Sequence, residues 1–158
     1  MDISIGIDIG GTKCALSVGD CTADTVKILH REEFPTAGLS WRQVLEAFAA
    51  RIDAYLAHPP SPTSHLSSPI PHPPSLTSIG ISCGGPLDSR RGVILSPPNL
   101  PGWDDVPVVS FFADRYHVPV HLQNDANACA YAEWKFGAGR GTRNMVFMTF
   151  GTGLGAGL

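Results

Sequence analysis

Three strand-like hydrophobic runs open the chain, at residues 3–9, 13–18 and 25–33. Apolar residues dominate each run, and short polar or glycine-containing segments separate them, which is typical of strands joined by tight turns. Gly19 and Asp20 lie between the second and third runs. The pattern therefore predicts an antiparallel opening to a sheet, with a turn at Gly19 and Asp20.

The spacing of apolar residues becomes helical over residues 41–56. The residues spaced to fill one face of this helix are Trp41, Val44, Leu45, Phe48, Ile52 and Tyr55. Ser40 and Gln43 fit a capping box, which supplies partners for backbone N–H groups at a helix start. Residues 58–77 are dominated by proline and serine and lack periodicity. That composition predicts a loop insertion at the surface, partly polyproline-like and mobile.

Strands and helices alternate in the middle of the chain. The pattern predicts strands at residues 78–83, 93–95 and 118–123, a turn at residues 84–88, and helices at residues 107–116 and 125–136. Such alternation indicates a parallel portion of the sheet. We therefore expect one α/β domain over residues 1–136.

Residues 144–150 and 154–158 have the pattern of a hairpin around a glycine-rich turn. The segment 137–141 before them, also rich in glycine, is expected to end the preceding helix and act as an interdomain hinge. A hairpin alone is marginally stable, and an exposed apolar edge invites pairing with another chain. Residues 137–158 are therefore expected to be a hinge and the first hairpin of a truncated C-terminal domain.

Composition narrows the functional classes. The chain has 158 residues, a formal net charge of -3 and four cysteines. It has no basic footprint, so neither nucleic acid nor a membrane surface is expected as a partner. The cysteines form no C-x-x-C pair, which argues against a zinc knuckle, and Cys83 and Cys129 are expected to be small buried residues. Without a signal-peptide pattern or a membrane-length apolar run, we expect a reduced cytoplasmic protein.

Two glycine-rich turns carry the candidate chemistry. The run Asp8-Ile9-Gly10-Gly11-Thr12-Lys13 follows the first strand pattern, and Gly151-Thr152-Gly153-Leu154-Gly155 follows a later one. Glycine lets the backbone approach a ligand closely, and successive exposed N–H groups form an anion site. Asp125 lies between the turns in sequence and supplies a carboxylate that can deprotonate a phosphate acceptor. The pattern predicts an ATP-dependent phosphotransferase.

Five motifs follow one another along the chain. They are Gly6-Ile7-Asp8-Ile9-Gly10-Gly11-Thr12-Lys13, Ile81-Ser82-Cys83-Gly84-Gly85-Pro86, Asn99-Leu100-Pro101-Gly102-Trp103, Asn124-Asp125-Ala126-Asn127 and Gly151-Thr152-Gly153-Leu154-Gly155. In these motifs the chain resembles the N-terminal half of the ROK family of repressors, open reading frames and sugar kinases. The resemblance implies an actin-like and hexokinase-like (ribonuclease H-like) ATPase fold, a mixed sheet flanked by helices. The proline- and serine-rich stretch departs from the family pattern, and the family's second half has no counterpart in the sequence.

The resemblance also implies roles at a sugar site. Asp125 is implied to be the catalytic base beside the acceptor hydroxyl. Asn99 and Asn124 are implied to hydrogen-bond other hydroxyls, and Gly84 and Gly85 to line the same substrate site.

A nucleotide site is implied in the same way. Asp8 is implied to hold Mg²⁺ through water, with ATP as the phosphoryl donor. The residues implied to contact its phosphates are Gly10, Gly11, Thr12 and Lys13 in the first turn and Gly151, Thr152 and Gly153 in the second.

Each of these residues has a structural alternative. Asp8 can bond its own turn backbone, and Asn99 can merely shape a turn among prolines. Asn124 or Asp125 can cap the helix that follows. Lys13 can pair at the sheet edge, because the turn lacks the G-x-x-x-x-G-K-[ST] order of a P-loop.

The sequence thus predicts a glucokinase-like sugar kinase that phosphorylates a hexose and forms a homodimer at full length. The fragment alone is expected to be inactive, since half of the cleft is absent. One alternative is a sugar-sensing ROK regulator, although the first strand begins at residue 3, where such regulators carry a helix-turn-helix module first. The other alternative is a noncatalytic ROK fragment.

Overall fold

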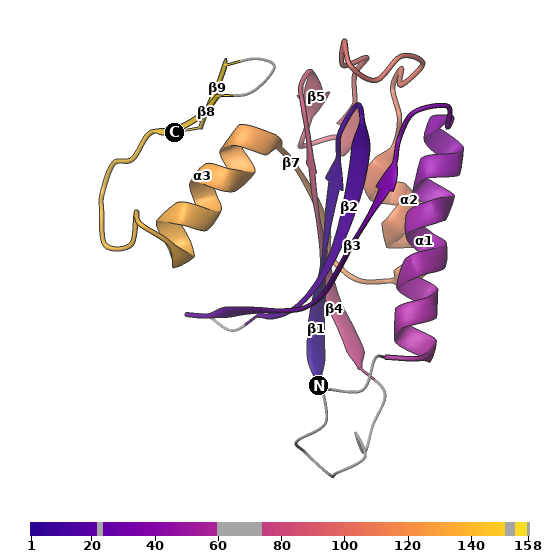
Figure 1. Cartoon of the computed structure of the whole chain (residues 1–158), viewed down its shortest axis with the longest axis horizontal. Coiled ribbons are helices and arrows are strands. Elements are labelled where there is room, and N and C mark those ends of the chain that lie inside the picture. Colours follow the sequence, from indigo (N-terminus) through magenta and orange to yellow (C-terminus); the bar gives the residue numbers. More distant parts are fainter. Residues whose placement is uncertain (22–23, 60–73, 151–153, 158) are drawn as a thin grey trace.

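A five-stranded mixed sheet with the strand order β3-β2-β1-β4-β7 organises the computed structural model (Figure 1). The structure describes residues 1–21, 24–59, 74–150 and 154–157. The strands of this sheet are β1 (Asp2–Ile9), β2 (Lys13–Cys21), β3 (Val26–Pro35), β4 (Ser75–Cys83) and β7 (Val120–Asn124). β1, β2 and β3 are antiparallel neighbours, whereas β4 runs parallel to β1 and β7 parallel to β4. Both the antiparallel opening and the parallel portion are confirmed.

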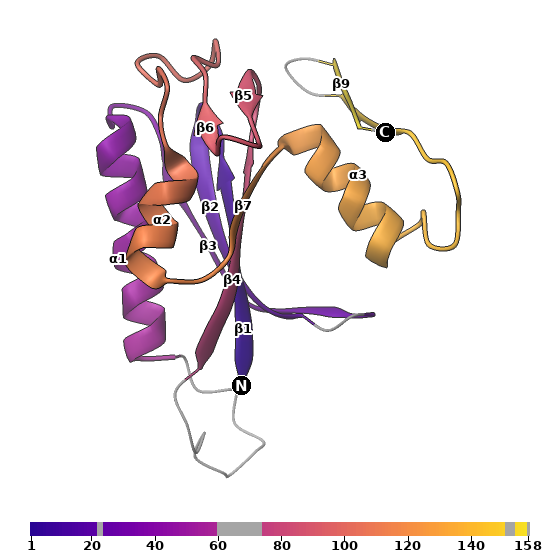
Figure 2. The same cartoon turned by 180° about the vertical axis from the view of Figure 1, so that it is seen from behind.

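The helices lie on opposite sides of this sheet. α1 (Trp41–Ala57) and α2 (Val108–Tyr116) cover one face, and α3 (Asp125–Phe136) lies on the other side, as Figures 1 and 2 both show. Two short hairpins complete the described chain, β5 (Leu87–Asp88) with β6 (Val93–Ile94) and β8 (Phe147–Phe150) with β9 (Leu154–Gly157). The hairpin predicted at the end of the chain is therefore confirmed, although its turn lies outside the described residues.

The main core forms between the sheet and the helices α1 and α2. Alternation along β1 turns four isoleucines into this core, Ile3, Ile5, Ile7 and Ile9, each at most 2% exposed. α1 contributes a stripe that includes Leu45, Phe48 and Ile52, as its spacing predicts. Because side chains alternate between the faces of a strand, Asp8 then lies on the face of β1 turned away from this core.

The start of α1 carries the predicted capping box. Ser40 is the N-cap, and its side chain accepts from the backbone N–H of Gln43. The Gln43 side chain in turn accepts from the backbone N–H of Ser40 at 2.8 Å. Two N–H groups that a helix start leaves open are thus satisfied locally.

The turn predicted at residues 84–88 is wrong in its second half, because Leu87 and Asp88 form β5 by pairing with β6, and β7 begins at Val120 and not at residue 118. Two other boundaries differ by more. Gly19 and Asp20 form no turn, because β2 continues to Cys21 and they pair with Ile28 and Lys27 after a register shift. Residues 75–77 belong to β4, since this strand pairs with β1 down to Asp2. In both cases pairing with a distant strand extends the element past the local signal. Most of the loop predicted for residues 58–77 lies outside the described residues.

The two cysteines predicted to be buried differ. Cys83 is fully buried at the end of β4, as predicted, whereas Cys129 on α3 is exposed. α3 buries only Ala126 and Ala130 among its residues, so its remaining surface, Cys129 included, stays accessible. The apolar character of cysteine thus predicts burial correctly in the sheet and wrongly on a helix that is covered on one narrow side. None of the described helices is long and apolar enough to span a membrane.

Candidate functional site

The carboxyl ends of β1, β4 and β7 meet at one edge of the sheet, the upper edge in Figure 1. The parallel registers place Ile9 beside Cys83 and Cys83 beside Asn124. The segments that follow each strand therefore lie next to one another, although they are far apart in sequence. In open α/β sheets, ligands bind outside the carboxyl ends of the strands.

Asn99 joins this edge from the loop between β6 and α2. The side chains of Leu100 and Trp103 are each 2% exposed and anchor the loop in the core. Backbone bonds from Leu100 N–H to the Pro97 carbonyl, at 2.9 Å, and from Ser96 N–H to the Trp103 carbonyl, at 2.8 Å, hold its shape. Asn99 itself stays exposed. Asn99 can therefore belong to a turn and still present its side-chain amide to a ligand.

Asn99 and Asp125 both lie beside Gly84, and Asn99 also lies against Gly11. A Cβ added to Gly84 would lie 3.9 Å from Asp125 Oδ2 and 3.9 Å from Asn99 Nδ2. A Cβ added to Gly11 would lie only 2.5 Å from the Asn99 carbonyl oxygen, closer than real Cβ atoms approach. The first glycine turn, the Asn99 loop and the start of α3 thus surround one small region.

Asn124 and Asp125 begin α3. The Asn124 side chain is the N-cap, and its Oδ1 accepts from the N–H of Ala126 at 3.1 Å and of Asn127 at 3.4 Å. Asp125 Oδ1 accepts from the same Ala126 N–H at 2.8 Å. The capping alternative is therefore confirmed for Asn124. No described residue donates a hydrogen bond to Asp125 Oδ2, the oxygen that lies toward Gly84, so this oxygen remains available for a ligand.

Asp8 is held by a neighbouring strand. Ser82 on β4 lies beside it in the parallel register, and the Ser82 hydroxyl donates to Asp8 Oδ1 at 2.6 Å. Both residues line a hollow of about 670 Å³ between the open face of the sheet and α3. Sequence reasoning missed Ser82, because its partner can be identified only once the register of β1 and β4 is known.

The first glycine turn presents backbone donors. A Cβ on Gly10 would lie 2.6 Å from the Lys13 carbonyl oxygen, so glycine is required for this tight return. Among the described residues, nothing accepts a hydrogen bond from the N–H of Gly11 or Thr12. Open successive N–H groups at a tight turn have the form of an anion site.

Lys13 does not lie in this turn as a free cation. Its Nζ contacts Glu33 Oε2 on β3 at 2.8 Å, and Arg31 contacts the other oxygen of Glu33 at 2.9 Å. These two donors, Lys13 first and Arg31 second, lower the pKa of the exposed Glu33 carboxyl. The structure places Lys13 as the pairing alternative predicts. The second glycine turn, residues 151–153, lies outside the described residues, so its predicted contact with the phosphates is untested.

The thiol of Cys83 is buried close to Asp125 and Asp8. Burial raises its pKa to about 12, and the carboxylates of Asp125 and Asp8 contribute further in the same direction. This thiol therefore stays protonated and is not a nucleophile at neutral pH. Within the described part of the chain, no group of three or more His, Cys, Asp or Glu side chains is placed to hold a metal ion.

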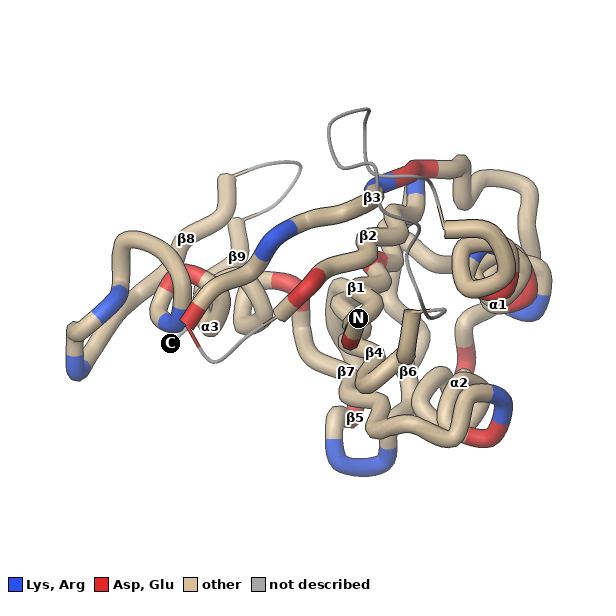
Figure 3. Tube along the Cα trace, turned by 90° about the horizontal axis from the view of Figure 1, so that it is seen from below, with Lys and Arg blue, Asp and Glu red and all other residues tan. Residues whose placement is uncertain are grey.

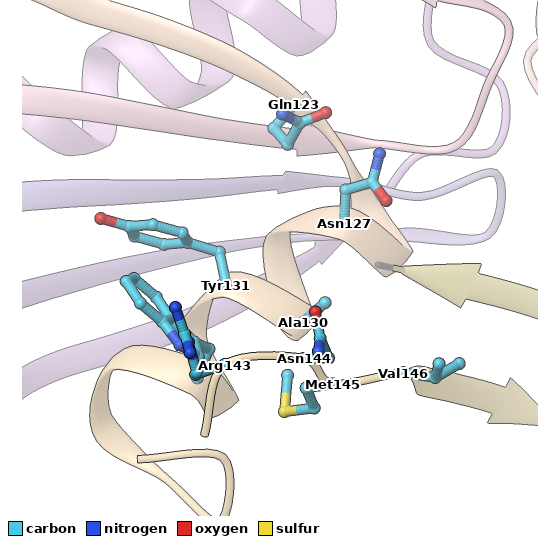
Figure 4. Close-up of a pocket in the computed structure, with 9 residues that line it drawn as sticks. Gln123, Asn127, Ala130, Tyr131, Arg143, Asn144, Met145 and Val146 are labelled. Atoms are coloured by element: carbon cyan, nitrogen blue, oxygen red, sulfur yellow. The ribbon is translucent and has the colours of Figure 1, made fainter. Parts of the chain in front are cut away.

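A second hollow, of about 690 Å³, lies between α3 and residues 143–146 and adjoins the first, with which it shares Gln123 and Tyr131 (Figure 4). Tyr131 and Arg143 lie close together along it, and Gln123 and Asn127 lie at its far end. Neither Asp125 nor the first glycine turn is among the residues that line it. The carboxylate and the open N–H groups therefore belong to the sheet edge and not to this hollow.

The mixed sheet with helices on both sides is the actin-like and hexokinase-like ATPase fold. A solved ROK family glucokinase from Streptomyces griseus, in complex with glucose and AMPPNP, matches with a TM-score of 0.74 and 30% identity over 98% of this chain and 43% of that chain. The ROK family model matches residues 4–158. The chain belongs to the ROK family.

Curated relatives include both kinases and repressors. The glucokinase of Streptomyces coelicolor is 33% identical over 159 residues, which covers 100% of this chain and 44% of that protein. The xylose repressor of Bacillus spizizenii is 34% identical over 95 residues, which covers 60% of this chain and 24% of that protein. The chain thus spans less than half the length of these relatives.

Proposed function

We propose that this chain forms the acceptor side and the first phosphate turn of an ATP-dependent sugar kinase that phosphorylates a hexose hydroxyl. The observation that carries this proposal is the convergence of Asn99, Asp125 and Gly84 beside the Gly11 turn. A carboxylate, an amide and open backbone N–H groups within one small region match the needs of phosphoryl transfer. That reaction depends mainly on positioning and charge stabilisation.

The acceptor residues have separable roles in this proposal. Asp125 Oδ2 takes the proton of the attacking hydroxyl, while its Oδ1 stays bonded to the start of α3. A carboxylate is a weak base, so Asp125 orients the hydroxyl early and accepts the proton late. Asn124 Oδ1 accepts the hydrogen bond of the helix cap, so its Nδ2 is the atom that can donate to a sugar hydroxyl. This Nδ2 lies 3.8 Å from the position of a Cβ on Gly85. Asn99 fixes the sugar from the opposite side.

The phosphate side uses backbone groups. The N–H groups of Gly11 and Thr12 bind phosphate oxygens of ATP, and Gly10 permits the tight turn. Asp8, oriented by Ser82, holds Mg²⁺ through water ligands, in keeping with the preference of Mg²⁺ to retain several waters. Bound there, Mg²⁺ neutralises charge on the phosphates. Gly151, Thr152 and Gly153 would contribute the second phosphate turn. Lys13, which is paired with Glu33, places a positive charge next to the first phosphate turn.

The division into domains and the assembly state belong to the same proposal. Residues 1–136 form the first domain, and residues 137–158 contribute a hinge and the first hairpin of the second. The whole protein acts as a homodimer in the cytoplasm, with the hexose as its small-molecule partner.

The competing function is a sugar-sensing regulator, and the similarity to the xylose repressor is the observation that favours it. The distribution of charged residues on the described part of this chain gives little support to a DNA-binding role. Lys and Arg residues are spread over several elements and interspersed with Asp and Glu (Figure 3). A DNA-contacting surface instead gathers basic residues on one face.

The test is a coupled ADP-release assay on the complete product of the gene that encodes this chain. ATP, Mg²⁺ and a panel of hexoses and N-acetylhexosamines are supplied, and the 158-residue chain is assayed in parallel. We expect sugar-dependent ADP release by the complete product, with one hexose preferred. Sugar binding without ADP release would move the protein to the sensor class, and neither binding nor release would favour the noncatalytic alternative.

Gly11→Ala is expected to weaken sugar binding. The new methyl would lie 2.5 Å from the Asn99 carbonyl oxygen and 2.9 Å from its Cβ, so the Asn99 loop must move. We expect KM for the hexose to rise by about tenfold or more, because a misplaced donor loses most of its hydrogen bond. Steady-state kinetics of the complete gene product measure this change.

Gly80→Ala is the matched control for Gly11→Ala. A Cβ on Gly80, in the same sheet, meets nothing within 4 Å. Its kinetic constants should match those of the parent. An unchanged hexose KM in Gly11→Ala would remove Asn99 from the sugar site.

A further inference from the structure

Thr36 is a buried polar residue beside the first glycine turn. It directly follows β3, the residue is 5% exposed, and it is the one polar or charged residue among the buried residues of the described chain. A polar side chain in such a place is costly unless its hydroxyl is hydrogen-bonded. Its partners therefore indicate what the hydroxyl does.

Thr36 bonds both ends of the turn. Its hydroxyl donates to the Gly10 carbonyl at 2.7 Å, and its backbone N–H donates to the Thr12 carbonyl at 3.0 Å. The second bond continues the pairing of β2 with β3, but the first is made by a side chain across 26 residues of sequence. One residue thus fixes two of the three carbonyls from Gly10 to Thr12.

The Thr36 hydroxyl has a second buried partner. The Cys14 thiol lies 3.2 Å from Thr36 Oγ1. Because the hydroxyl proton points to Gly10, the thiol is the donor of this contact. Burial raises the pKa of Cys14 and outweighs the contacts with Thr36 and Gly10, which lower it, so the thiol keeps its proton at neutral pH. The chain from thiol to hydroxyl to carbonyl leaves the hydroxyl a single orientation.

The hydrogen bond to the Gly10 carbonyl also sets the direction of the Gly11 N–H. In a trans peptide the C=O and the following N–H point in opposite directions. With its carbonyl tied to Thr36, the peptide between Gly10 and Gly11 must direct the Gly11 N–H away from Thr36. This is one of the N–H groups without an acceptor in the described chain. The orientation of the proposed phosphate donor is therefore decided by a residue that does not touch the phosphate.

We propose that Thr36 is a positioning residue for the nucleotide, which locks the Gly10 to Thr12 turn so that the Gly11 N–H faces the phosphates of ATP. This rests on the proposed kinase function. The role requires a hydroxyl at position 36 and not merely a buried side chain of that size.

The test compares Thr36→Val, which keeps the shape and removes the hydroxyl, with Thr36→Ser, which keeps the hydroxyl. Thr77→Val is the matched control. It removes a hydroxyl bond of similar length, 2.9 Å to the Ile3 carbonyl, at the opposite end of the same sheet. All variants are made in the complete gene product. We measure KM for ATP and for the hexose, and amide hydrogen exchange of the peptide that contains residues 10–13, with and without AMPPNP.

In Thr36→Val we expect KM for ATP to rise by roughly tenfold, as a carbonyl in a buried setting loses its donor, while KM for the hexose changes by less than about twofold. Exchange at residues 10–13 should become faster, and its slowing by AMPPNP should be lost. Thr36→Ser should restore the ATP KM and the exchange pattern. Thr77→Val should leave both at parent values.

Two results would overturn the role of Thr36. One is an ATP KM and an exchange pattern in Thr36→Val that match the parent. The other is an equal rise of both KM values with no rescue by serine, which indicates general destabilisation. If the parent releases no ADP with any sugar, the kinase proposal fails, and the exchange experiment with AMPPNP then decides the role of Thr36 by itself.

Discussion

Asp125→Asn in the complete gene product is expected to lower kcat by roughly a thousandfold, the middle to upper range for loss of a general base. Asparagine has the same size and keeps an oxygen that can accept from the Ala126 N–H, so the start of α3 should be retained. The amide cannot take a proton from the sugar hydroxyl. Hexose affinity, measured by calorimetry, should therefore change by less than about threefold.

Asp114→Asn controls for the substitution itself. Asp114 is an exposed carboxylate on α2, remote from the sheet edge, and its replacement should leave kcat and hexose affinity unchanged. A kcat for Asp125→Asn within about tenfold of the parent, equivalent to 1.4 kcal/mol of barrier, is incompatible with Asp125 as the base. Loss of hexose binding together with kcat would instead indicate a role in binding.

Asp8→Ala is expected to damage the Mg²⁺-dependent step. The substitution removes the only carboxylate that the proposal assigns to the hydrated ion, while the sugar site contains other residues. We expect kcat to fall by about a hundredfold and the Mg²⁺ concentration for half-maximal rate to rise by at least tenfold, as for loss of a metal-orienting group. Titration of activity with Mg²⁺ at saturating hexose measures both.

Two further variants sharpen the Asp8 experiment. Asp2→Ala removes an exposed carboxylate at the other end of β1 and should change neither quantity. Ser82→Ala removes the 2.6 Å bond that orients Asp8 and should give an intermediate Mg²⁺ dependence. A Mg²⁺ dependence of Asp8→Ala that coincides with the parent would remove Asp8 from the metal site.

The order of elements could be predicted from the sequence because its signals are local. The capping box at Ser40 and Gln43 needs three residues of context, and α3 has the predicted bounds, Asp125–Phe136. The turn predicted at Gly19 and Asp20 was wrong because pairing of β2 with β3 outweighed the preference of these residues for turns. Cys129 shows the same limit, since exposure depends on which side of α3 is covered.

The candidate site was only partly predictable. The glycine turn, Asn99 and Asp125 could be named from their motifs, because each motif is a short run with its own backbone requirement. Ser82 and Thr36 carry no such signal. Ser82 gains its role from lying beside Asp8 across 74 residues of sequence, and Thr36 from meeting the Gly10 carbonyl across 26. Neither separation can be bridged without knowing which strands are neighbours.

The sequence by itself determined the types of the elements, the capping of α1, the glycine turn and the identity of the residues that can carry the chemistry. These properties depend on side-chain periodicity and on backbone freedom over a few residues. Only the tertiary structure decided that Asn99 lies against Gly11 and Gly84 faces Asp125. It also decided that Asn124 Oδ1 caps a helix and that Thr36 holds the turn. The physical reason is that parallel strand register and the packing of Leu100 and Trp103 bring these groups together, and both arise only when the whole sheet forms.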